Sequence, residues 1–318
     1  MMAQMSSGGT DAPGLARYGI ALQSLRNYSL SEQLTAIGAS GAAGVGIPRA
    51  AVPSDLSGVD VARRLKNAGL TATFCIPGET SLMPRFRYSR AARARISRGL
   101  VGTEGERGAF SLERQVQGIV DGLHWLAPLE PAGVVVLTGA QGERGAAEAW
   151  EMAVEGLGRI DEEARKLGLP LALEPCNPRY APEYTMLDTI DKTLALIDAV
   201  VTDNVGVLID VFHVWETDDV FGQIQRAAGR ISGVHVVDIA ETPRSLQDRL
   251  FPGDGVADLP ALIRAVEGTG FRGWYDCEFV TDEDFADSAA LAGLPADEIA
   301  RRCATGFLEA SKAAYASA

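Results

Sequence analysis

The sequence predicts a single domain with the (β/α)₈ barrel fold, and three observations support this. Short apolar runs alternate with helical patterns eight times along the 318 residues, a length that one barrel domain commonly has. No G-x-G-x-x-G sequence follows an early run, which disfavours a doubly wound open sheet. Four of the runs end in an acid or a histidine, and in this fold the active site lies at the carboxyl ends of the strands.

The first four predicted strands are apolar segments, each followed by a segment with helical periodicity. These strands are Tyr18–Leu22, Ala43–Ile47, Leu70–Ile76 and Gly133–Leu137. The helices that follow are Ser29–Ile37, Val59–Asn67, Val116–Leu126 and Gly145–Leu167. We expect Ser31 to open the first of these helices, Gly69 to stop the second and Ser111 to start the third.

The last four predicted strands run directly into polar residues. Pro170–Leu173 leads into Glu174, Val205–Asp210 ends in its own carboxylate, Ile231–Val234 leads into His235, and Gly273–Cys277 leads into Glu278. The helices that follow are Leu187–Val200, Val220–Ala228, Leu259–Glu267 and Ile299–Ala314. Because side chains alternate faces along a strand, Asp276 shares a face with Glu278.

These strand ends predict a metal site. A carboxylate at the end of so apolar a run as VGVLID loses much of its water, so it must be paired, hydrogen-bonded or bound to a cation. For Asp210 alone, capping of the next helix is an equally good explanation. Three carboxylates and one imidazole together are a familiar ligand set for a divalent cation. Asp238 and Asp276 are interpreted either as partners of the ligands or as strand-end caps.

Composition narrows the class of protein. Hydrophobic residues make up 47% of the chain, and no run of 18 or more apolar residues is present, so we expect neither a transmembrane helix nor a membrane partner. The net charge of -13 argues against a nucleic-acid partner. The four cysteines form no C-x-x-C pair and suit a reducing cytoplasm. Residues 1–16 lack the features of a secretory signal and are expected to be a disordered tail before a barrel of residues 17–318.

One long loop stands out. The segment Pro77–Ala109 is rich in arginine at positions 85, 87, 90, 93, 95 and 98. It is interpreted as a solvated surface loop with a short helix. The alternatives are a lid over the barrel mouth or a docking surface for another chain, because long loops are often functional.

The second half of the chain resembles the xylose isomerase-like barrel superfamily of sugar phosphate isomerases and epimerases, which includes ketose 3-epimerases. The matching motifs are Glu174-x-x-Asn177, Asp210-x-x-His213, His235, Arg249-x-x-Pro252-Gly253-x-Gly255 and Glu278. The strand–helix rhythm matches over the whole barrel, and the specific motifs only over its second half.

The resemblance implies roles for these residues. One divalent metal ion would be held by Glu174, Asp210, His235 and Glu278. The preferred ion is Mn²⁺, and Co²⁺ and Mg²⁺ are the alternatives. Glu174 and Glu278 would also be the acid–base pair. His213, Arg249 and Asn177 would bind the substrate. Some relatives carry histidine where this chain has Asn177, which cannot act as a base. All four lysines fall in helical patterns, so the catalytic lysine of xylose isomerase proper is absent.

The function expected from these features is a metal-dependent isomerase or epimerase of a small carbohydrate. It would remove a proton next to a carbonyl and pass through a metal-stabilised enediolate. The alternative is a lyase on the same scaffold, either a C-glycoside deglycosidase subunit acting on 3-keto glycosides or a sugar or inosose dehydratase. A barrel that only binds sugar is disfavoured by the intact ligand set. We expect a homo-oligomer, or a hetero-oligomer for the deglycosidase.

Overall fold

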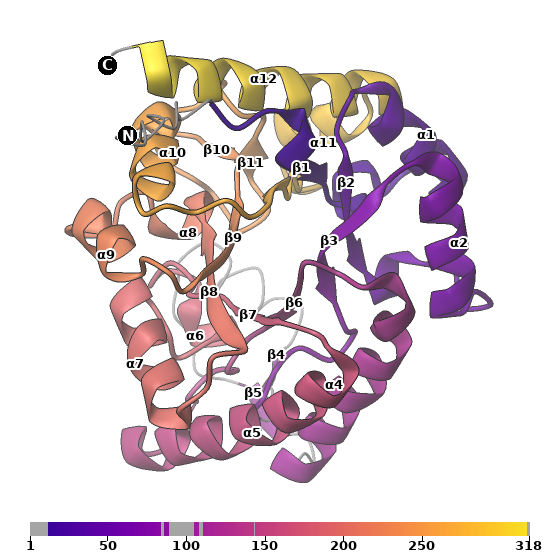
Figure 1. The fold of residues 1–318 in the computed structure, drawn as a ribbon. Helices are drawn as coiled ribbons and strands as arrows, with labels where there is room; N and C mark the ends of the chain where they lie inside the picture. The colour runs from indigo at the N-terminus through magenta and orange to yellow at the C-terminus, as the bar shows by residue number, and fades with distance from the viewer. Residues whose placement is uncertain (1–11, 84–85, 89–104, 108–110, 143, 317–318) are drawn as a thin grey trace, which may run out of the picture.

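The computed structural model describes residues 12–83, 86–88, 105–107, 111–142 and 144–316. Eight parallel strands close into a barrel ringed by helices (Figure 1), so the predicted fold is confirmed. The order around the barrel is β1, β12, β9, β8, β7, β6, β3 and β2. The strands are β1 Tyr18–Ile20, β2 Gly44–Pro48, β3 Thr71–Ile76, β6 Gly133–Val136, β7 Leu171–Leu173, β8 Val205–Asp210, β9 Ile231–His235 and β12 Tyr275–Cys277.

Helices on the outside of the barrel cover the strands. They are α1 Leu30–Ala39, α2 Gly58–Ala68, α4 Leu112–Leu126, α5 Ala146–Leu167, α7 Ile190–Val200, α9 Val220–Arg226, α10 Leu259–Gly268 and α12 Ala296–Ala316. The predicted opening of α1 at Ser31 is wrong. Ser29 is the N-cap, because its hydroxyl accepts from the Glu32 amide and the Glu32 carboxylate accepts from the Ser29 amide. The predicted roles of Ser111 and Gly69 at helix ends are confirmed.

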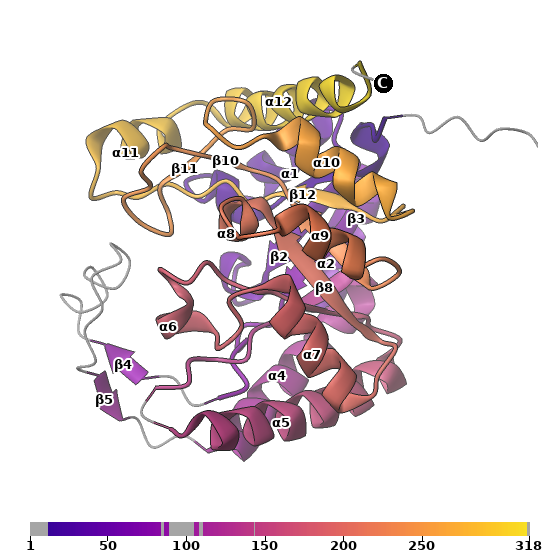
Figure 2. The same cartoon turned by 90° about the vertical axis from the view of Figure 1, so that its left-hand side faces the viewer.

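Short elements fill the connections. They are the 3₁₀ helices η1 Leu15–Arg17, η2 Leu22–Leu25, η3 Arg49–Ala51 and η4 Ala127–Leu129, the helices α6 Ala181–Tyr184, α8 Val211–Val214 and α11 Ala286–Ala292, and the strand pairs β4 Phe86–Tyr88 with β5 Gly105–Arg107 and β10 Asp238–Ile239 with β11 Arg249–Leu250. The first strand is shorter than predicted, because the chain turns into η2 after Ala21. Figure 2 shows α6, α11 and the β4–β5 pair on one side of the barrel, the side of the strands' carboxyl ends.

Two sequence predictions fall partly outside the described residues. The tail predicted over residues 1–16 is described only from residue 12, and its last part is anchored, because the Ser311 hydroxyl donates to the Pro13 carbonyl and η1 ends at Arg17. In the predicted loop Pro77–Ala109, Arg87 is the only one of the six arginines within a described segment. Within the described residues, no helix is both long and apolar enough to cross a membrane.

The barrel interior below the strand ends is apolar on the side of β3, β6, β7 and β8. Phe74, Val135, Ala172 and Leu208 form a small buried cluster, separate from the larger core between strands and helices. The Phe74 ring reaches across to β9, where a Cβ atom on Gly233 would lie 1.8 Å from its Cζ. Glycine is therefore required at position 233. The same ring meets the His235 imidazole edge-on at 5.6 Å between centroids, so an apolar floor supports the polar strand ends above it.

Candidate metal centre

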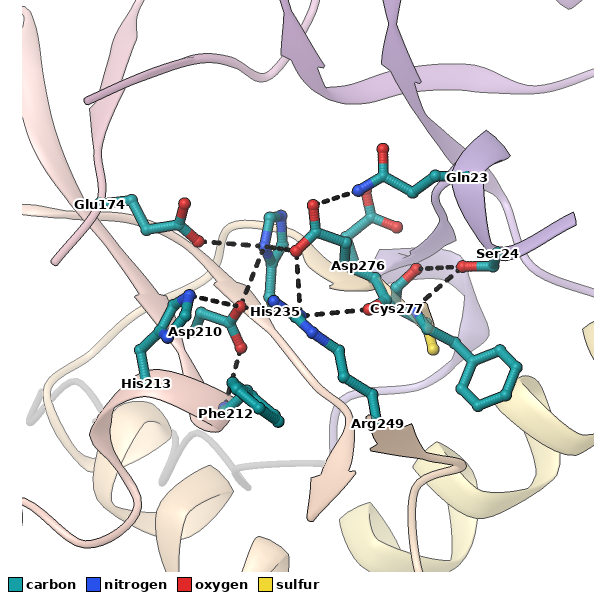
Figure 3. A network of polar contacts seen from close by, with 12 residues as sticks. Gln23, Ser24, Glu174, Asp210, Phe212, His213, His235, Arg249, Asp276 and Cys277 are labelled. Carbon is teal, nitrogen blue, oxygen red and sulfur yellow. Dashed lines mark hydrogen bonds and ion pairs between the residues drawn. The ribbon is translucent and has the colours of Figure 1, made fainter. Parts of the chain in front are cut away.

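Four adjacent strands bring the predicted ligands together. Glu174 follows β7, Asp210 ends β8, His235 ends β9 and Glu278 follows β12, and these strands are consecutive in the barrel. Each residue offers one ligand atom, and these four atoms lie within 4.8 Å of one another. Figure 3 shows three of these residues, Glu174, Asp210 and His235, with their side chains directed toward one another. We call the four residues the quartet. Strand periodicity and the parallel register, which pairs Asp210 with His235, place them at one edge.

The imidazole of His235 faces the three carboxylates at distances longer than hydrogen bonds. Its Nδ1 atom lies 3.5 Å from Glu174 Oε1, 3.7 Å from Glu278 Oε2 and 4.0 Å from Asp210 Oδ2. Both His235 Nδ1 and Glu174 Oε1 are buried and have no hydrogen-bond partner. Buried polar atoms without partners are costly, and native proteins rarely keep them.

The quartet fits a divalent cation. Three carboxylates and one imidazole suit Mn²⁺, Co²⁺, Mg²⁺ or Zn²⁺. The unpartnered oxygen of Glu174 and the unpartnered nitrogen of His235 would both be satisfied as its ligands. The predicted metal ligands are therefore grouped as such a site requires.

Burial and mutual charge set the protonation of these groups. Burial raises the pKa of Glu174 to about 7, although His235 acts in the opposite direction. Burial also acts against the charge of His235, but the neighbouring carboxylates outweigh it and raise the pKa of His235 to about 10. A bound cation would replace the positive charge of the imidazolium, so metal uptake would release a proton.

Asp210 serves two purposes with its two oxygens. Oδ1 accepts from the Phe212 amide at 2.9 Å and so caps α8, while Oδ2 lies 2.9 Å from Arg249 Nη1. The two explanations that the sequence left open for this residue are therefore compatible. Burial acts against the ionised carboxyl, but Arg249, His213 and His235 outweigh it and lower the pKa of Asp210. Asp210 is thus held as an anion in the barrel mouth.

Arg249 lies inside the site. Its Nη1 atom is 2.9 Å from Asp210 Oδ2, 3.0 Å from Glu278 Oε2 and 3.1 Å from the Glu278 carbonyl oxygen. The guanidinium also lies over the Phe212 ring at 4.7 Å from its centroid. Arg249 is almost fully buried, so its charge acts mainly on these carboxylates.

The spacing after Arg249 has a structural explanation in Asp238. The Asp238 carboxylate accepts from the backbone amides of Gly253 and Ala257, each at 3.0 Å, and so anchors the loop after β11. A Cβ atom on Gly255 would lie 2.4 Å from Asp238 Oδ1. Of the two interpretations left open for Asp238, the structure supports the strand-end cap.

His213 lies beside the quartet on α8. Its Nε2 atom is 3.7 Å from Asp210 Oδ2, its Nδ1 atom is buried without a hydrogen-bond partner, and its ring meets Phe212 edge-on. Burial lowers the pKa of His213 to about 4. The imidazole is therefore neutral at neutral pH and can both donate and accept a hydrogen bond.

Asn177 is hydrogen-bonded to the next loop. Its amide group donates to Glu216 Oε1 at 2.8 Å, and its oxygen accepts from the Arg179 amide at 3.0 Å. Both ends of the side chain are thus engaged in joining the segment after β7 to the segment after α8. A role in substrate binding would use the second N–H of the amide group or the second lone pair of its oxygen.

Two further polar residues occupy the β12 side. Gln23 in η2 donates its amide to Glu278 Oε1, and the sequence analysis missed it. Its only sequence signal is that it is polar and closely follows the first strand. Asp276 lies one side-chain repeat below Glu278, where its Oδ2 atom accepts from the Thr73 hydroxyl at 2.6 Å. Burial raises the pKa of Asp276 to about 7.

Comparisons with known proteins agree with this geometry. Residues 36–302 match the model of the xylose isomerase-like TIM barrel family. An L-ribulose 3-epimerase of Mesorhizobium japonicum is 27% identical over 256 residues, which cover 78% of this chain and 76% of the epimerase. An inosose dehydratase of Geobacillus thermodenitrificans is 23% identical over 155 residues, 44% of this chain and 50% of that protein. The crystal structure of the IolI protein with a bound zinc atom has a TM-score of 0.70 at 17% identity, covering 94% of this chain and 99% of that one.

Proposed function

Because the chain belongs to the xylose isomerase-like TIM barrel family, we propose that it is a divalent-metal-dependent isomerase or epimerase of a small carbohydrate. The observation that carries the proposal is the quartet, in which Glu174 Oε1 and His235 Nδ1 are buried without a hydrogen-bond partner. The match to L-ribulose 3-epimerase over most of both chains supports the same reaction class.

The two glutamates suit the transfer of a proton next to a carbonyl. Glu174 follows β7 and Glu278 follows β12, and their carboxylates lie 3.5 and 3.7 Å from Nδ1 of His235. One carboxylate would take the proton from the carbon while the C–H electron pair moves into the carbonyl group. The other, in its protonated form, would return a proton to the opposite face of the same carbon. General acid–base help of this kind contributes about 10²–10⁴ in rate.

The metal ion would be held by Glu174, Asp210, His235 and Glu278, and when bound it would polarise the carbonyl and stabilise developing negative charge. We propose Mn²⁺, with Co²⁺ or Mg²⁺ as alternatives, and the zinc atom bound in the IolI structure, which has the same fold, supports a divalent ion. Arg249 would add a fixed positive charge next to the substrate oxygens. His213, as a neutral imidazole, would bind a hydroxyl group, and Asn177 would contribute the second N–H of its amide group.

A lyase is the second candidate, and the similarity to an inosose dehydratase favours it. The first step, removal of a proton next to a carbonyl, would use the same carboxylates. The reactions differ only in what happens next, because a lyase expels a hydroxyl or an aglycone instead of taking a proton back.

The decisive experiment is to incubate the Mn²⁺-loaded protein in D₂O with a panel of ketoses, inososes and 3-keto glycosides. We expect deuterium at the carbon next to the carbonyl, together with an epimer or an isomer of the sugar. Deuterium with loss of water or aglycone would assign the lyase instead. Absence of exchange with every sugar, despite a full complement of metal, would contradict both reactions.

We propose a homo-oligomer for the isomerase or epimerase. The deglycosidase would instead require a second kind of chain. Sedimentation of the purified protein, alongside its activity, distinguishes the two, because a single chain type that is active by itself excludes a required partner.

A further inference from the structure

The two oxygens of the Glu278 carboxylate have different partners. Its Oε2 atom faces Arg249 Nη1 at 3.0 Å and His235 Nδ1 at 3.7 Å. The other oxygen, Oε1, accepts a hydrogen bond from the side-chain amide of Gln23 (Figure 3). Both oxygens of Glu278 therefore have a defined partner, and rotation of the carboxylate would break at least one contact.

The segment that carries Gln23 is tied to the chain on both sides of Glu278. The Ser24 hydroxyl donates to the Cys277 carbonyl at 3.2 Å and accepts from the Phe279 amide at 3.0 Å. The Ala21 amide donates to the same Cys277 carbonyl at 2.9 Å. Gln23 and Glu278 are thus presented to each other by backbone segments locked through three hydrogen bonds.

The 3₁₀ helix η2 is also held by hydrogen bonds from α1. The buried side chain of Gln33 in α1 donates to the carbonyl oxygens of Leu25 at 2.8 Å and Leu22 at 3.3 Å. These bonds fix the turn in which Gln23 lies. A side chain on so constrained a turn loses little additional freedom when it binds Glu278.

Glu174 lacks such support. Its Oε1 atom has no hydrogen-bond donor, and among the described residues its one charged partner within 4.0 Å is His235. The two carboxylates that share the proposed proton transfer are therefore unequal. One is oriented before substrate arrives, and the other is oriented only by the groups that bind in the site.

We propose that Gln23 is a positioning residue that fixes the Glu278 carboxylate with its Oε2 atom toward the other residues of the quartet. Proton exchange at the face of the substrate carbon served by Glu278 should therefore depend on Gln23 more than exchange at the opposite face does. This inference rests on the proposed function. The proton leaves carbon for Glu278 and the C–H electron pair moves into the carbonyl, so Gln23 itself gains and loses nothing. Its amide acts only through the orientation and charge stabilisation of Glu278.

The test uses Gln23→Met, which keeps the length of the side chain and removes the donor. Exchange of solvent deuterium is measured separately from each epimer of the substrate found in the panel, with Mn²⁺ bound. We expect kcat for the face served by Glu278 to fall about 10-fold or more, the range of one hydrogen bond to a charged group, with a much smaller change at the other face. KM and the Mn²⁺ dissociation constant, the latter from calorimetric titration, should change little.

The matched control is Asn27→Ala. Asn27 lies four residues further along on the exposed side and donates its amide to the Ala292 carbonyl at 2.9 Å. Its loss should alter neither face. A crystal structure of Gln23→Met with metal bound gives a readout besides activity, and we expect the Glu278 carboxylate there in more than one orientation.

The outcomes separate the two proposals. A wild-type protein that exchanges no proton in any sugar contradicts the proposed function, whatever Gln23 does. A wild-type protein that exchanges, with Gln23→Met equal to it at both faces, overturns the role of Gln23 alone. Equal losses at both faces together with weaker Mn²⁺ binding would also overturn it, because Gln23 would then support the whole site and not one carboxylate.

Discussion

The first half of the barrel (β1, β2, β3 and β6) and the second half (β7, β8, β9 and β12) differ in how the polar groups at their strand ends are hydrogen-bonded. In the first half, Glu79 follows β3 and accepts from the amides of Thr80 and Ser81 at 3.0 and 3.1 Å. Thr138, after β6, bonds to Thr185 and to the Met186 amide. In the second half, Glu174 Oε1 and His235 Nδ1 are buried with no hydrogen-bond partner.

The difference shows where an additional group belongs. A polar strand end that is already hydrogen-bonded within the protein has little to offer a ligand. One that is buried and unsatisfied is stable only if something else binds it or if the fold tolerates the cost. We call the first rim self-contained, because its polar groups are satisfied within the protein, and the second rim receptive. Thr138 and Gln23 both form hydrogen bonds between the two.

The largest effect should follow from Asp210→Ala, which tests the receptive half directly. We expect Mn²⁺ affinity to fall by more than about 100-fold, since even groups behind metal ligands account for about 10- to 100-fold. Arg249 would be left buried without this partner, which costs about 3–5 kcal/mol of the free energy of unfolding when a buried pair is broken. Metal analysis after chelation and reconstitution, with urea unfolding, measures both.

Asp210→Asn separates the two consequences. It retains an oxygen that can accept from the Phe212 amide and cap α8, so the fold should suffer less while metal affinity still falls. Wild-type metal content in either variant would place the ion elsewhere and remove the basis of the comparison.

A smaller effect, confined to turnover, is expected from Glu174→Gln and Glu278→Gln. Each keeps its shape and one oxygen ligand but removes the base, so weak binding of metal and substrate should persist while turnover falls by about 10² or more. Isotope exchange should differ between the variants if the carboxylates serve opposite faces. Should either turn over at the wild-type rate with metal bound, that glutamate is a ligand only, and His213 becomes the first alternative base.

The smallest functional effect is expected in the self-contained half. Thr138→Val removes a buried hydroxyl that donates to the Gly139 carbonyl at 3.0 Å and accepts from the Met186 amide at 2.9 Å. The free energy of unfolding should fall by about 1–3 kcal/mol, because buried groups lose their partners. Mn²⁺ stoichiometry and affinity should remain those of the wild type. A loss of metal comparable to that of Asp210→Ala would show that the two rims are not independent.

The sequence by itself determined the barrel and the quartet. Apolar runs alternating with amphipathic helices predict parallel strands, and a parallel barrel puts all carboxyl ends at one edge. Glu174, Asp210, His235 and Glu278 could therefore be grouped without knowing any distance, because each stands at the end of its own run. Local sequence also offered capping by Asp210 as one of two explanations, and the structure shows that hydrogen bond.

The tertiary structure alone decided what surrounds the quartet. Gln23 and Glu278 are 255 residues apart and meet because closure of the barrel pairs β1 with β12. Arg249 reaches Asp210 across 39 residues through the β10–β11 hairpin. Asn177 is directed to Glu216 by its own loop, although the motif spacing suggested the substrate. Strand ends follow from periodicity, which is local, whereas partners of a side chain depend on which distant segments the closed barrel brings within hydrogen-bond distance.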